Sequence, residues 1–435
     1  METKLARIAQ IAKERPKEKF TSLAHLINEE MLLECHNELK ANKAAGVDEV
    51  TKAEYEENLQ ENIKRLHESL KDMTYIPQPV RRVYIPKPGK SELRPLGIPA
   101  YEDKIVQLAI SKILTAIFEQ DFMNFSYGFR PHRSAHDALR SLNETIMTKK
   151  INWIVDADIK GFFEHVDHAW MMRCLEVRIA DTSLLRIIAR ILKSGVMENG
   201  EISQNEEGTP QGGIISPILA NIYLHYVLDL WFEKIMKKQF KGSAEMVRYA
   251  DDFICSFQYK EEAEIFYNEL IERLKKFNLE IAKDKSKIIE FGRFAAGDRK
   301  ARGEGKPETF DFLGFTHYCG VSRSSKFRVK RKTSRKKLKG AIQKMKKWIK
   351  SNRTKPINEM WKGVRIKLLG HYRYYGVTDN SQMMEKYKRI TEKEFFKWLN
   401  RRSQSKSYTW EKFRKYLNEK PLPIPKIYVK IWEKA

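Results

Sequence analysis

The chain has 435 residues, of which 42% are hydrophobic and 32% charged, and its formal net charge is +25 at neutral pH. This length allows two or three packed units, and the composition excludes a disordered or collagen-like chain. No apolar run approaches the roughly 18 residues that a membrane span needs, and the mixed-charge start is unlike a signal peptide. The four cysteines stand far apart and match no zinc or redox spacing, so we expect reduced, partly buried thiols in a cytosolic protein.

Helices are expected at the N-terminal end of the chain. Leu and Ile recur at helical spacing between Leu23 and Leu39, so residues 1–75 are predicted to form a helical N-terminal extension. Prolines then bound a short strand expected at residues 80–85. Apolar residues fall largely on one side of a helix predicted for residues 101–118.

Residues 153–159 (Trp-Ile-Val-Asp-Ala-Asp-Ile) predict a buried strand that carries two acids. Asp156 and Asp158 are two residues apart, so their side chains share one face of the strand. Two helices are predicted to follow, at residues 169–178 and 183–192.

A glycine-rich segment comes next, at residues 208–217 (Gly-Thr-Pro-Gln-Gly-Gly-Ile-Ile-Ser-Pro). Paired glycines allow a backbone to approach a ligand closely. Ser216 and Pro217 are typical of a helix start, so a helix is predicted for residues 218–230.

Residues 249–252 (Tyr-Ala-Asp-Asp) place two adjacent carboxylates between apolar runs, which predicts a strand, a tight turn and a second strand. Taken alone, the pair is also compatible with a solvated acidic turn. Adjacent buried carboxylates are unfavourable unless a cation neutralises them, and Asp158 supplies a third acid from another strand. Such carboxylates can hold a pair of Mg²⁺ ions, the arrangement that clamps both oxygens of an in-line phosphoryl transfer. The sequence therefore predicts a catalytic site for two Mg²⁺ ions, with Asp251, Asp252 and an acid of the strand at residues 153–159 as ligands.

The remaining pattern combines strands and helices. It predicts a helix at residues 261–277, a strand at 280–282, a mobile loop at 292–307, and helices after residue 333 with breaks near 352–356 and 377–380. Alternating elements around an antiparallel acidic hairpin predict an α+β fold, followed by a helical C-terminal region.

Most of the positive charge lies in the last part of the chain. From Val321 onward there are 35 Lys and Arg against 8 Asp and Glu, a net charge of +27, so the first 320 residues together carry about −2. A charge run is often only a solvated face, but a whole region at +27 repels itself unless a polyanion neutralises it. We therefore expect a phosphate-binding surface whose affinity falls with salt. Its candidate RNA-binding residues are Arg323, Lys326, Arg328, Lys330, Arg331, Lys332, Arg335, Lys336 and Lys337.

Several blocks, in the same order along the chain, resemble those of the reverse transcriptases. Beside the two acidic segments, these blocks are residues 85–99, 129–138, 208–217, 283–287 and 312–315. More narrowly, the chain resembles the reverse transcriptases encoded by bacterial group II introns, the intron maturases. The segments that carry this narrower resemblance are residues 42–48, 125–131, 370–377 and 397–404.

The resemblance implies the right-hand shape of a polymerase. Residues 1–75 would be the N-terminal extension, residues 76–320 the fingers and palm, and residues 321–435 the thumb, also called the maturase domain. The acidic hairpin would lie in the palm, and the thumb would be basic and α-helical.

The resemblance also assigns roles to single residues. It implies that Asp158, the second acid of its strand, joins Asp251 and Asp252 as a catalytic metal ligand. Phe163 is placed where the family has the gate that excludes a ribose 2′-hydroxyl. Glu164 stands where the family usually has Asp, and since it is not one of the three metal ligands we expect it to be tolerated.

Four further residues are implied to bind the nucleotide. Lys87 and Arg94 are expected to reach the triphosphate from the fingers, because cations on a hairpin supply donors to phosphate. Gln211 would contact the nucleotide sugar or the base pair. Lys285 would lie near the leaving pyrophosphate as a candidate general acid. The alternative for these cations is an ordinary solvated surface.

The implied function is an RNA-directed DNA polymerase that binds its group II intron RNA, assists its splicing and copies it into cDNA during intron mobility. Its expected partners are the intron RNA, an RNA template with a DNA primer, dNTPs and target DNA, in the bacterial cytosol. Many relatives end in a zinc-supported HNH nuclease, and since no Cys pair clusters near the C-terminus we expect none here and a primer from elsewhere. Two alternatives remain open. One is a splicing cofactor that mainly binds RNA, and the other is a polymerase that copies RNA into RNA, which Phe163 disfavours.

Overall fold

The two acidic segments lie on neighbouring strands of one sheet in the computed structural model of the chain, which describes residues 2–86, 93–203, 207–208, 212–322, 324–402 and 408–432. The sheet has the order β6-β7-β3-β8, and every pairing in it is antiparallel. Its strands are β3 (Trp153–Asp158), β6 (Ala244–Tyr249), β7 (Asp252–Phe257) and β8 (Lys287–Glu290). The predicted acidic strand and hairpin are thus confirmed.

One predicted strand of this sheet is wrong. Residues 280–282 make only a single bridge, between Ile159 and Ile281, and the edge of the sheet is formed by β8 instead. The expected loop at residues 292–307 also contains a short helix, α11 (Ala295–Ala301). Both errors concern short segments, in which periodicity carries little information.

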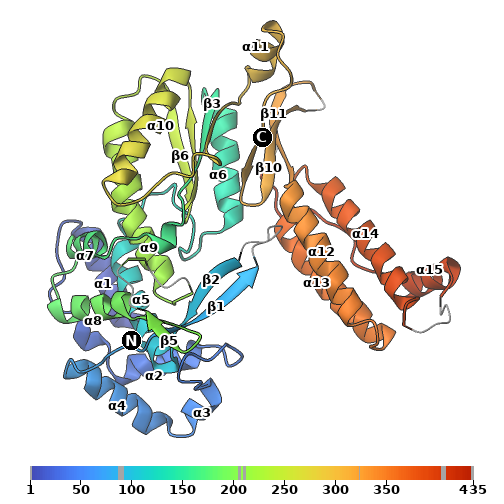
Figure 1. Cartoon of the computed structure of the whole chain (residues 1–435). Helices are drawn as coiled ribbons and strands as arrows, with labels where there is room; N and C mark the ends of the chain where they lie inside the picture. The colour runs from blue at the N-terminus through green and yellow to red at the C-terminus, as the bar shows by residue number, and fades with distance from the viewer. Residues whose placement is uncertain are drawn as a thin grey trace.

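Alternate residues of β3 enter two different cores, because successive side chains of a strand point to opposite faces. Val155 belongs to a core that includes α10 (Lys260–Lys275), and Ile154 belongs to a second core that includes α6 (Ala135–Thr148). Figure 1 shows these two helices on either side of the sheet. Asp158 is four residues after Ile154 and therefore points to the α6 side.

A second sheet and a group of helices occupy the lower left of Figure 1. The sheet has the order β2-β1-β4-β5 and contains β1 (Val80–Pro86), β2 (Leu93–Ile98), β4 (Val196–Glu198) and β5 (Glu201–Ser203). The predicted N-terminal helices are α1 (Glu2–Glu14), α2 (Glu29–Glu38), α3 (Lys52–Glu56) and α4 (Leu59–Lys71).

Helix α5 (Tyr101–Phe118) packs against α1 and α2, and its buried side chains belong to the same core as those on one face of the acidic sheet. Ile105, Ile110 and Ile113 are among its fully buried side chains. Burial of each such side chain stabilises the fold by about 1.5–3 kcal/mol relative to exposure. The helix is therefore a central part of the core that the N-terminal helices and the acidic sheet share.

The helices after β3 also follow the predicted positions. They are α7 (His168–Glu176), α8 (Thr182–Lys193) and α9 (Ser216–Leu224). Two π-helical turns, His225–Asp229 and Phe232–Met236, follow α9. Such turns are rare and often occur at functional sites.

A third sheet connects the palm to the C-terminal helices. It has the order β11-β10-β9, with β9 (Phe310–Phe312), β10 (Phe315–Val321) and β11 (Phe327–Thr333). Since Val321 pairs with Phe327, the expected domain boundary at residues 320 and 321 falls inside a hairpin. We therefore place the boundary after β11.

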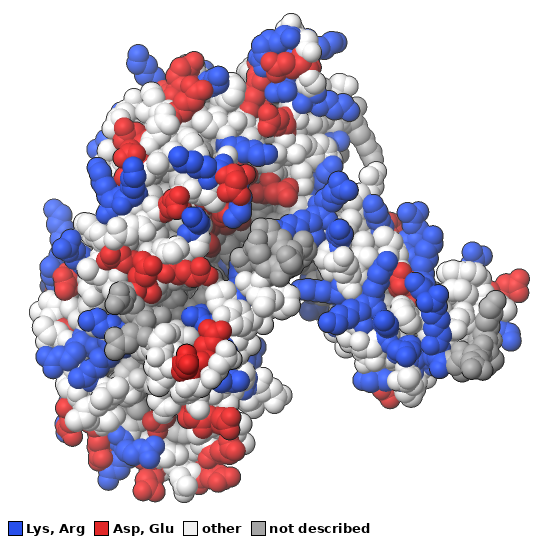
Figure 2. Space-filling model, in the orientation of Figure 1, with Lys and Arg blue, Asp and Glu red and all other residues white. Residues whose placement is uncertain are grey.

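The C-terminal region is helical, as predicted. Its helices are α12 (Arg335–Ser351), α13 (Ile357–Tyr375), α14 (Ser381–Leu399) and α15 (Trp410–Glu419), and they share a core of their own. They project from the palm like a thumb, and Lys and Arg gather over them (Figures 1 and 2). Figure 2 shows the molecule open between these helices and the N-terminal half.

The end of the described chain returns to the palm. Val429 makes a parallel bridge with Val377, and Ile431 is buried in the core that includes α6. The thumb is therefore held to the palm by packing as well as by the chain connection at residues 333–335.

Two expectations from composition can be compared with the fold. Of the helices in the described ranges, none is both long and apolar enough to cross a membrane. All four cysteines are unpaired, and three of them, Cys35, Cys174 and Cys255, are buried, as predicted.

Candidate active site

The Tyr-Ala-Asp-Asp segment forms the tip of the β6–β7 hairpin. Tyr249 pairs with Asp252, so Ala250 and Asp251 make the two-residue connection. Ala250 has φ +58°, which such a connection requires at its first residue. On the adjacent strand, Asp158 lies directly opposite Asp252. Opposed residues of an antiparallel pair have Cβ atoms about 5 Å apart, so the three predicted acids meet at one end of the sheet.

These carboxylates perturb one another. Burial raises the pKa of Asp252 to about 8, and the charges of Asp156 and Asp251 add to this effect. A hydrogen bond from the backbone N–H of Leu313 opposes it. Burial also raises the pKa of Asp251, with a contribution from the charge of Asp158. A divalent cation among such groups would favour their charged forms again.

The donor set fits a hard divalent cation, because Mg²⁺ prefers carboxylate oxygens and keeps several water ligands. In the part of the chain that the structure describes, no three His, Cys, Asp or Glu side chains are placed so that they could hold a metal ion. The acids are thus neighbours but not a preformed cage.

Lys285 forms an ion pair with the first acid. Its Nζ lies 3.0 Å from Oδ2 of Asp158, and both side chains are about half exposed. A pair at this exposure contributes less than about 1 kcal/mol to stability. The backbone N–H of Asp158 donates to Oγ of Ser286 at 3.2 Å. The structure therefore brings Lys285 to the acidic site, and its role at the leaving pyrophosphate stays a prediction.

Of the four other predicted nucleotide-binding residues, the structure describes Arg94 and Phe163. Arg94 on β2 is exposed, and its charge acts on Asp251 by lowering the pKa of that carboxyl. Phe163 lies in a short 3₁₀ turn, with its ring centroid 5.2 Å from that of Phe162. Lys87 and Gln211 lie outside the described residues.

The nine predicted RNA-binding residues differ in their exposure to solvent where the structure describes them. Arg323 lies outside the described residues. The prediction for Arg331 is wrong: its side chain is fully buried and donates to Asn143 at 2.5 Å, so RNA cannot reach it. Arg328 is paired with Asp379 at 3.1 Å, which leaves it half-buried. Lys330 is also half-buried, and the exposed members are Lys326, Lys332, Arg335, Lys336 and Lys337.

A cavity of about 660 Å³ lies beside the acids, between β8, the third sheet and α12. Asp156 lines it, and burial raises the pKa of this carboxyl to about 7, with contributions from Asp158 and Asp311. The basic residues that line the cavity are Lys285, Lys287, Arg335, Lys336 and Lys339. A ring of cations next to the acidic site is suited to a nucleic acid backbone.

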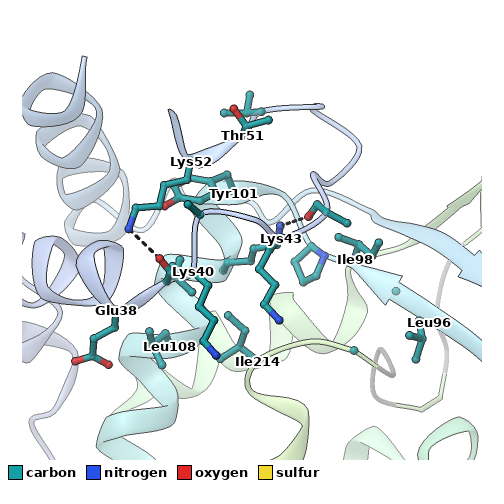
Figure 3. A pocket seen from close by; sticks show the side chains of 18 residues that line it. Glu38, Lys40, Lys43, Thr51, Lys52, Leu96, Ile98, Tyr101, Leu108 and Ile214 are labelled. Atoms are coloured by element: carbon teal, nitrogen blue, oxygen red, sulfur yellow. Dashed lines mark hydrogen bonds between the residues drawn. The ribbon is translucent and has the colours of Figure 1, made fainter. Parts of the chain in front are cut away.

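A second cavity, of about 480 Å³, lies away from the acids at the base of the β1–β2 hairpin. The segment between α2 and α3, strand β2, helix α5 and the residues before α9 enclose it. Figure 3 shows Lys40 and Lys43 extending across this cavity toward Leu108 and Ile214. Its mainly apolar lining distinguishes it from the acidic site.

Sequence reasoning missed a buried residue directly before the turn. Arg248 is fully buried and forms an ion pair with Asp229, which is also fully buried. The available signal was a charged residue directly after the apolar pair Met246 and Val247, at a position where the strand is expected to be buried. Its partner is 19 residues away in the chain, and no local pattern indicates it.

His225 lies beside the buried pair of Arg248 and Asp229, and its burial makes the stability of the fold depend on pH. Burial lowers its pKa to about 4, the charges of Arg248 and Arg130 act in the same direction, and Asp229 opposes them. Between pH 6.5 and 4 the unfolded chain thus binds a proton that the folded chain does not, and stability falls as the pH falls. From pH 7 to pH 5 we expect a loss of about 2 kcal/mol from this group. Urea denaturation at pH 7 and pH 5 should show that the free energy of unfolding falls by about 2 kcal/mol less in His225→Gln than in the native chain. An equal fall in the two proteins would contradict the prediction.

Comparisons with known proteins agree with this geometry. Residues 85–317, more than half of the chain, match the family model described as reverse transcriptase (RNA-dependent DNA polymerase). The chain is 38% identical over 244 residues to the group II intron-encoded protein LtrA of Lactococcus lactis subsp. cremoris, a match that covers 56% of this chain and 40% of that protein. It is 36% identical over 237 residues to the protein YkfC of Escherichia coli (strain K12), covering 48% and 62%. A shorter match, 30% over 95 residues, relates it to the nuclear intron maturase 1 of Arabidopsis thaliana, covering 22% and 13%. The chain therefore spans less than two thirds of the length of each of these relatives.

Proposed function

Because the chain belongs to the reverse transcriptase (RNA-dependent DNA polymerase) family, we propose that it is an RNA-directed DNA polymerase whose reaction takes place at the palm carboxylates. The observation that carries this proposal is the position of Asp158 opposite Asp252, with Asp251 at the adjoining hairpin tip. A solvated acidic turn would not need a third acid from a separate strand.

Asp158 and Asp251 would hold two Mg²⁺ ions, with Asp252 as a further ligand, and bound Mg²⁺ would lower the pKa of the primer 3′-hydroxyl and neutralise charge on the pyrophosphate. The side chains themselves act mainly by positioning and by charge neutralisation. Arg94, together with Lys87, would bind the triphosphate from the fingers. Lys285 would give its Nζ proton to the leaving pyrophosphate.

We also propose that the protein binds group II intron RNA and assists its splicing; one of its relatives is named a group II intron-encoded protein and another a nuclear intron maturase. The support on this chain is the set of exposed cations on β11 and α12, which face solvent near the acidic site. The RNA template, the DNA primer and the target DNA would use the same basic surface. One basic surface can thus serve both splicing and cDNA synthesis.

Primer extension tests the proposed activity. The full chain, a DNA primer annealed to an RNA template, dNTPs and Mg²⁺ should give extended product. Absence of product with tight RNA binding would overturn the polymerase and leave the alternative of a splicing cofactor. Extension with rNTPs in preference to dNTPs would instead favour an RNA-copying enzyme.

Phe163→Val is expected to let ribonucleotides enter. The smaller side chain would remove the steric block to the 2′-hydroxyl, and a few carbon atoms in a close-fitting site change discrimination by about 10–200-fold. We expect the ratio of kcat/KM for dNTP over rNTP to fall by at least tenfold, as measured by single-nucleotide incorporation. The control is Phe162→Val, a change at the buried neighbour that does not face the nucleotide in this proposal. An unchanged ratio in Phe163→Val would show that Phe163 does not exclude the ribose 2′-hydroxyl.

A further inference from the structure

Arg248 joins the metal turn to a helix that lies behind it. Its Nε and Nη2 atoms donate to Oδ1 and Oδ2 of Asp229 at 2.7 and 2.5 Å, and both side chains are 0% exposed. Asp229 is the last residue of the π-helical turn that follows α9. The pair therefore fixes the end of β6 to a helix outside the sheet.

The remaining guanidinium nitrogen of Arg248 is directed at the turn. Its Nη1 donates to the carbonyl oxygen of Ala250 at 2.9 Å and to Oδ1 of Asn221 at 3.1 Å. Ala250 is the residue with φ +58°, a conformation that non-glycine residues adopt only when their surroundings hold it. The carbonyl directly before Asp251 is thus held by a buried cation.

The turn is held from its other side by the backbone at Gly128. A Cβ atom at Gly128 would lie 2.2 Å from the amide nitrogen of Ala250, so only glycine fits there. Nδ2 of Asn221 donates to the carbonyl oxygen of Gly128 at 2.7 Å. Asn221 therefore contacts both Gly128 and Arg248, the two residues that hold the turn. Gly128 belongs to residues 125–131, a segment to which the proposed function had assigned no role.

Stability alone does not require this buried ion pair. Replacing a buried pair by apolar side chains of similar size is often neutral or stabilising, whereas removing one partner is strongly destabilising. An apolar pair could hold the helix against the strand equally well. It could not donate a hydrogen bond to the carbonyl of Ala250.

We propose that Arg248, held by Asp229 and Asn221, is a positioning residue that fixes the Ala250 carbonyl and so orients Asp251 and Asp252 for metal binding. The proposal rests on the proposed polymerase function. Groups that orient metal ligands typically change metal affinity or activity by about 10–100-fold when they are removed.

The double variant Arg248→Met/Asp229→Leu tests the proposal without leaving a buried charge unpaired. We expect Mn²⁺ to bind about tenfold more weakly, measured without nucleic acid from the free-Mn²⁺ signal in electron paramagnetic resonance. We also expect kcat in primer extension to fall at least tenfold, with the Mg²⁺ concentration for half-maximal rate raised and RNA binding unchanged. Asp251→Asn, which removes a proposed metal ligand, shows how far Mn²⁺ affinity and primer extension fall when the metal site itself is damaged.

A second ion pair, between the buried Arg178 and the largely buried Asp121, provides the matched control. Arg178 donates to Asp121 at 2.7 Å and, like Arg248, also donates to backbone carbonyl oxygens, those of Ala12 and Pro16. It lies away from the turn, so Arg178→Met/Asp121→Leu should alter stability to a similar degree but leave Mn²⁺ binding unchanged. Equal weakening in both double variants would mean a general packing effect and would overturn the proposal, as would wild-type Mn²⁺ affinity in the Arg248 variant.

Asn221→Leu decides the question if the Arg248 double variant does not fold. It keeps the ion pair but removes the link between Arg248 and Gly128, and the same weakening of Mn²⁺ binding is expected, smaller in size. Wild-type Mn²⁺ affinity in Asn221→Leu would then overturn the proposal. Because Mn²⁺ binding is measured without a reaction, a native chain that binds Mn²⁺ but extends no primer would refute the polymerase and still test the role of Arg248.

Discussion

Asp251→Asn is expected to reduce primer extension by at least about a thousandfold, with little change in RNA binding. The substitution keeps the size of the side chain but removes the charge at the hairpin tip, where the metal-bound site would lie. Stabilisation of the transition state by metal is worth several kcal/mol, and about 4 kcal/mol corresponds to a thousandfold in rate. Single-turnover extension at saturating Mg²⁺ measures the effect.

Loss of folding would not explain that result. Burial and the charge of Asp158 raise the pKa of Asp251, so its charged form destabilises the metal-free protein above the unfolded pKa, and Asn removes that penalty. The variant should therefore unfold at an equal or higher urea concentration at pH 7. Asp298→Asn, the same change at an exposed position on α11, is the control and should keep full activity. If Asp251→Asn retained a tenth of the native rate, the assignment of the metal site would be wrong.

Replacing Arg335, Lys336 and Lys339 together with Gln is expected to weaken binding of structured RNA by roughly a hundredfold at 0.15 M salt. These side chains are exposed, and they line the cavity next to Asp156. Each lost phosphate contact should reduce the slope of log K against log salt by about 1, so the slope should fall by about 2–3. Filter binding over a range of salt concentrations measures both quantities.

Side-chain substitution is a sharper test of this surface than truncation. Deleting the region after residue 321 would expose palm core, since Val329, Val377 and Ile431 pack in the same cluster as α6 residues. The matched control is replacement of the exposed Lys13, Lys17 and Lys19 by Gln, which removes the same charge from the N-terminal helices and the segment after α1. An equal loss of affinity in the control would show that net charge alone, and not this surface, determines RNA binding.

Sequence patterns were sufficient where the relevant residues are neighbours in the chain. The Tyr-Ala-Asp-Asp turn is specified by two apolar runs around a short acidic connection, and the structure forms the predicted hairpin there. Helix α5 and the breaks before α13 and α14 were predicted nearly where they are observed, because the apolar periodicity there is long, whereas the break between α14 and α15 was not predicted. The elements at residues 280–282 and 292–307 were predicted wrongly, because these segments are too short to show a periodicity.

The basic C-terminal region shows the limit of composition. The net charge of +27 belongs to the sequence and predicts a polyanion as partner. Composition could not tell that Arg331 points into the protein while Lys332 faces solvent, because that depends on which face of β11 packs against α6. Only the position of Asn143 on α6 decides where the guanidinium of Arg331 lies.

The sequence by itself determined which residues are candidates for the chemistry: three aspartates, a lysine after the acidic hairpin and a strongly basic C-terminal region. The tertiary structure alone decided how they meet. Asp158 and Lys285 are 127 residues apart and form an ion pair, and Arg248 finds Asp229 behind the turn. Such partners come together only when strands and helices pack, because the free energy of a buried contact depends on proximity in space and not along the chain.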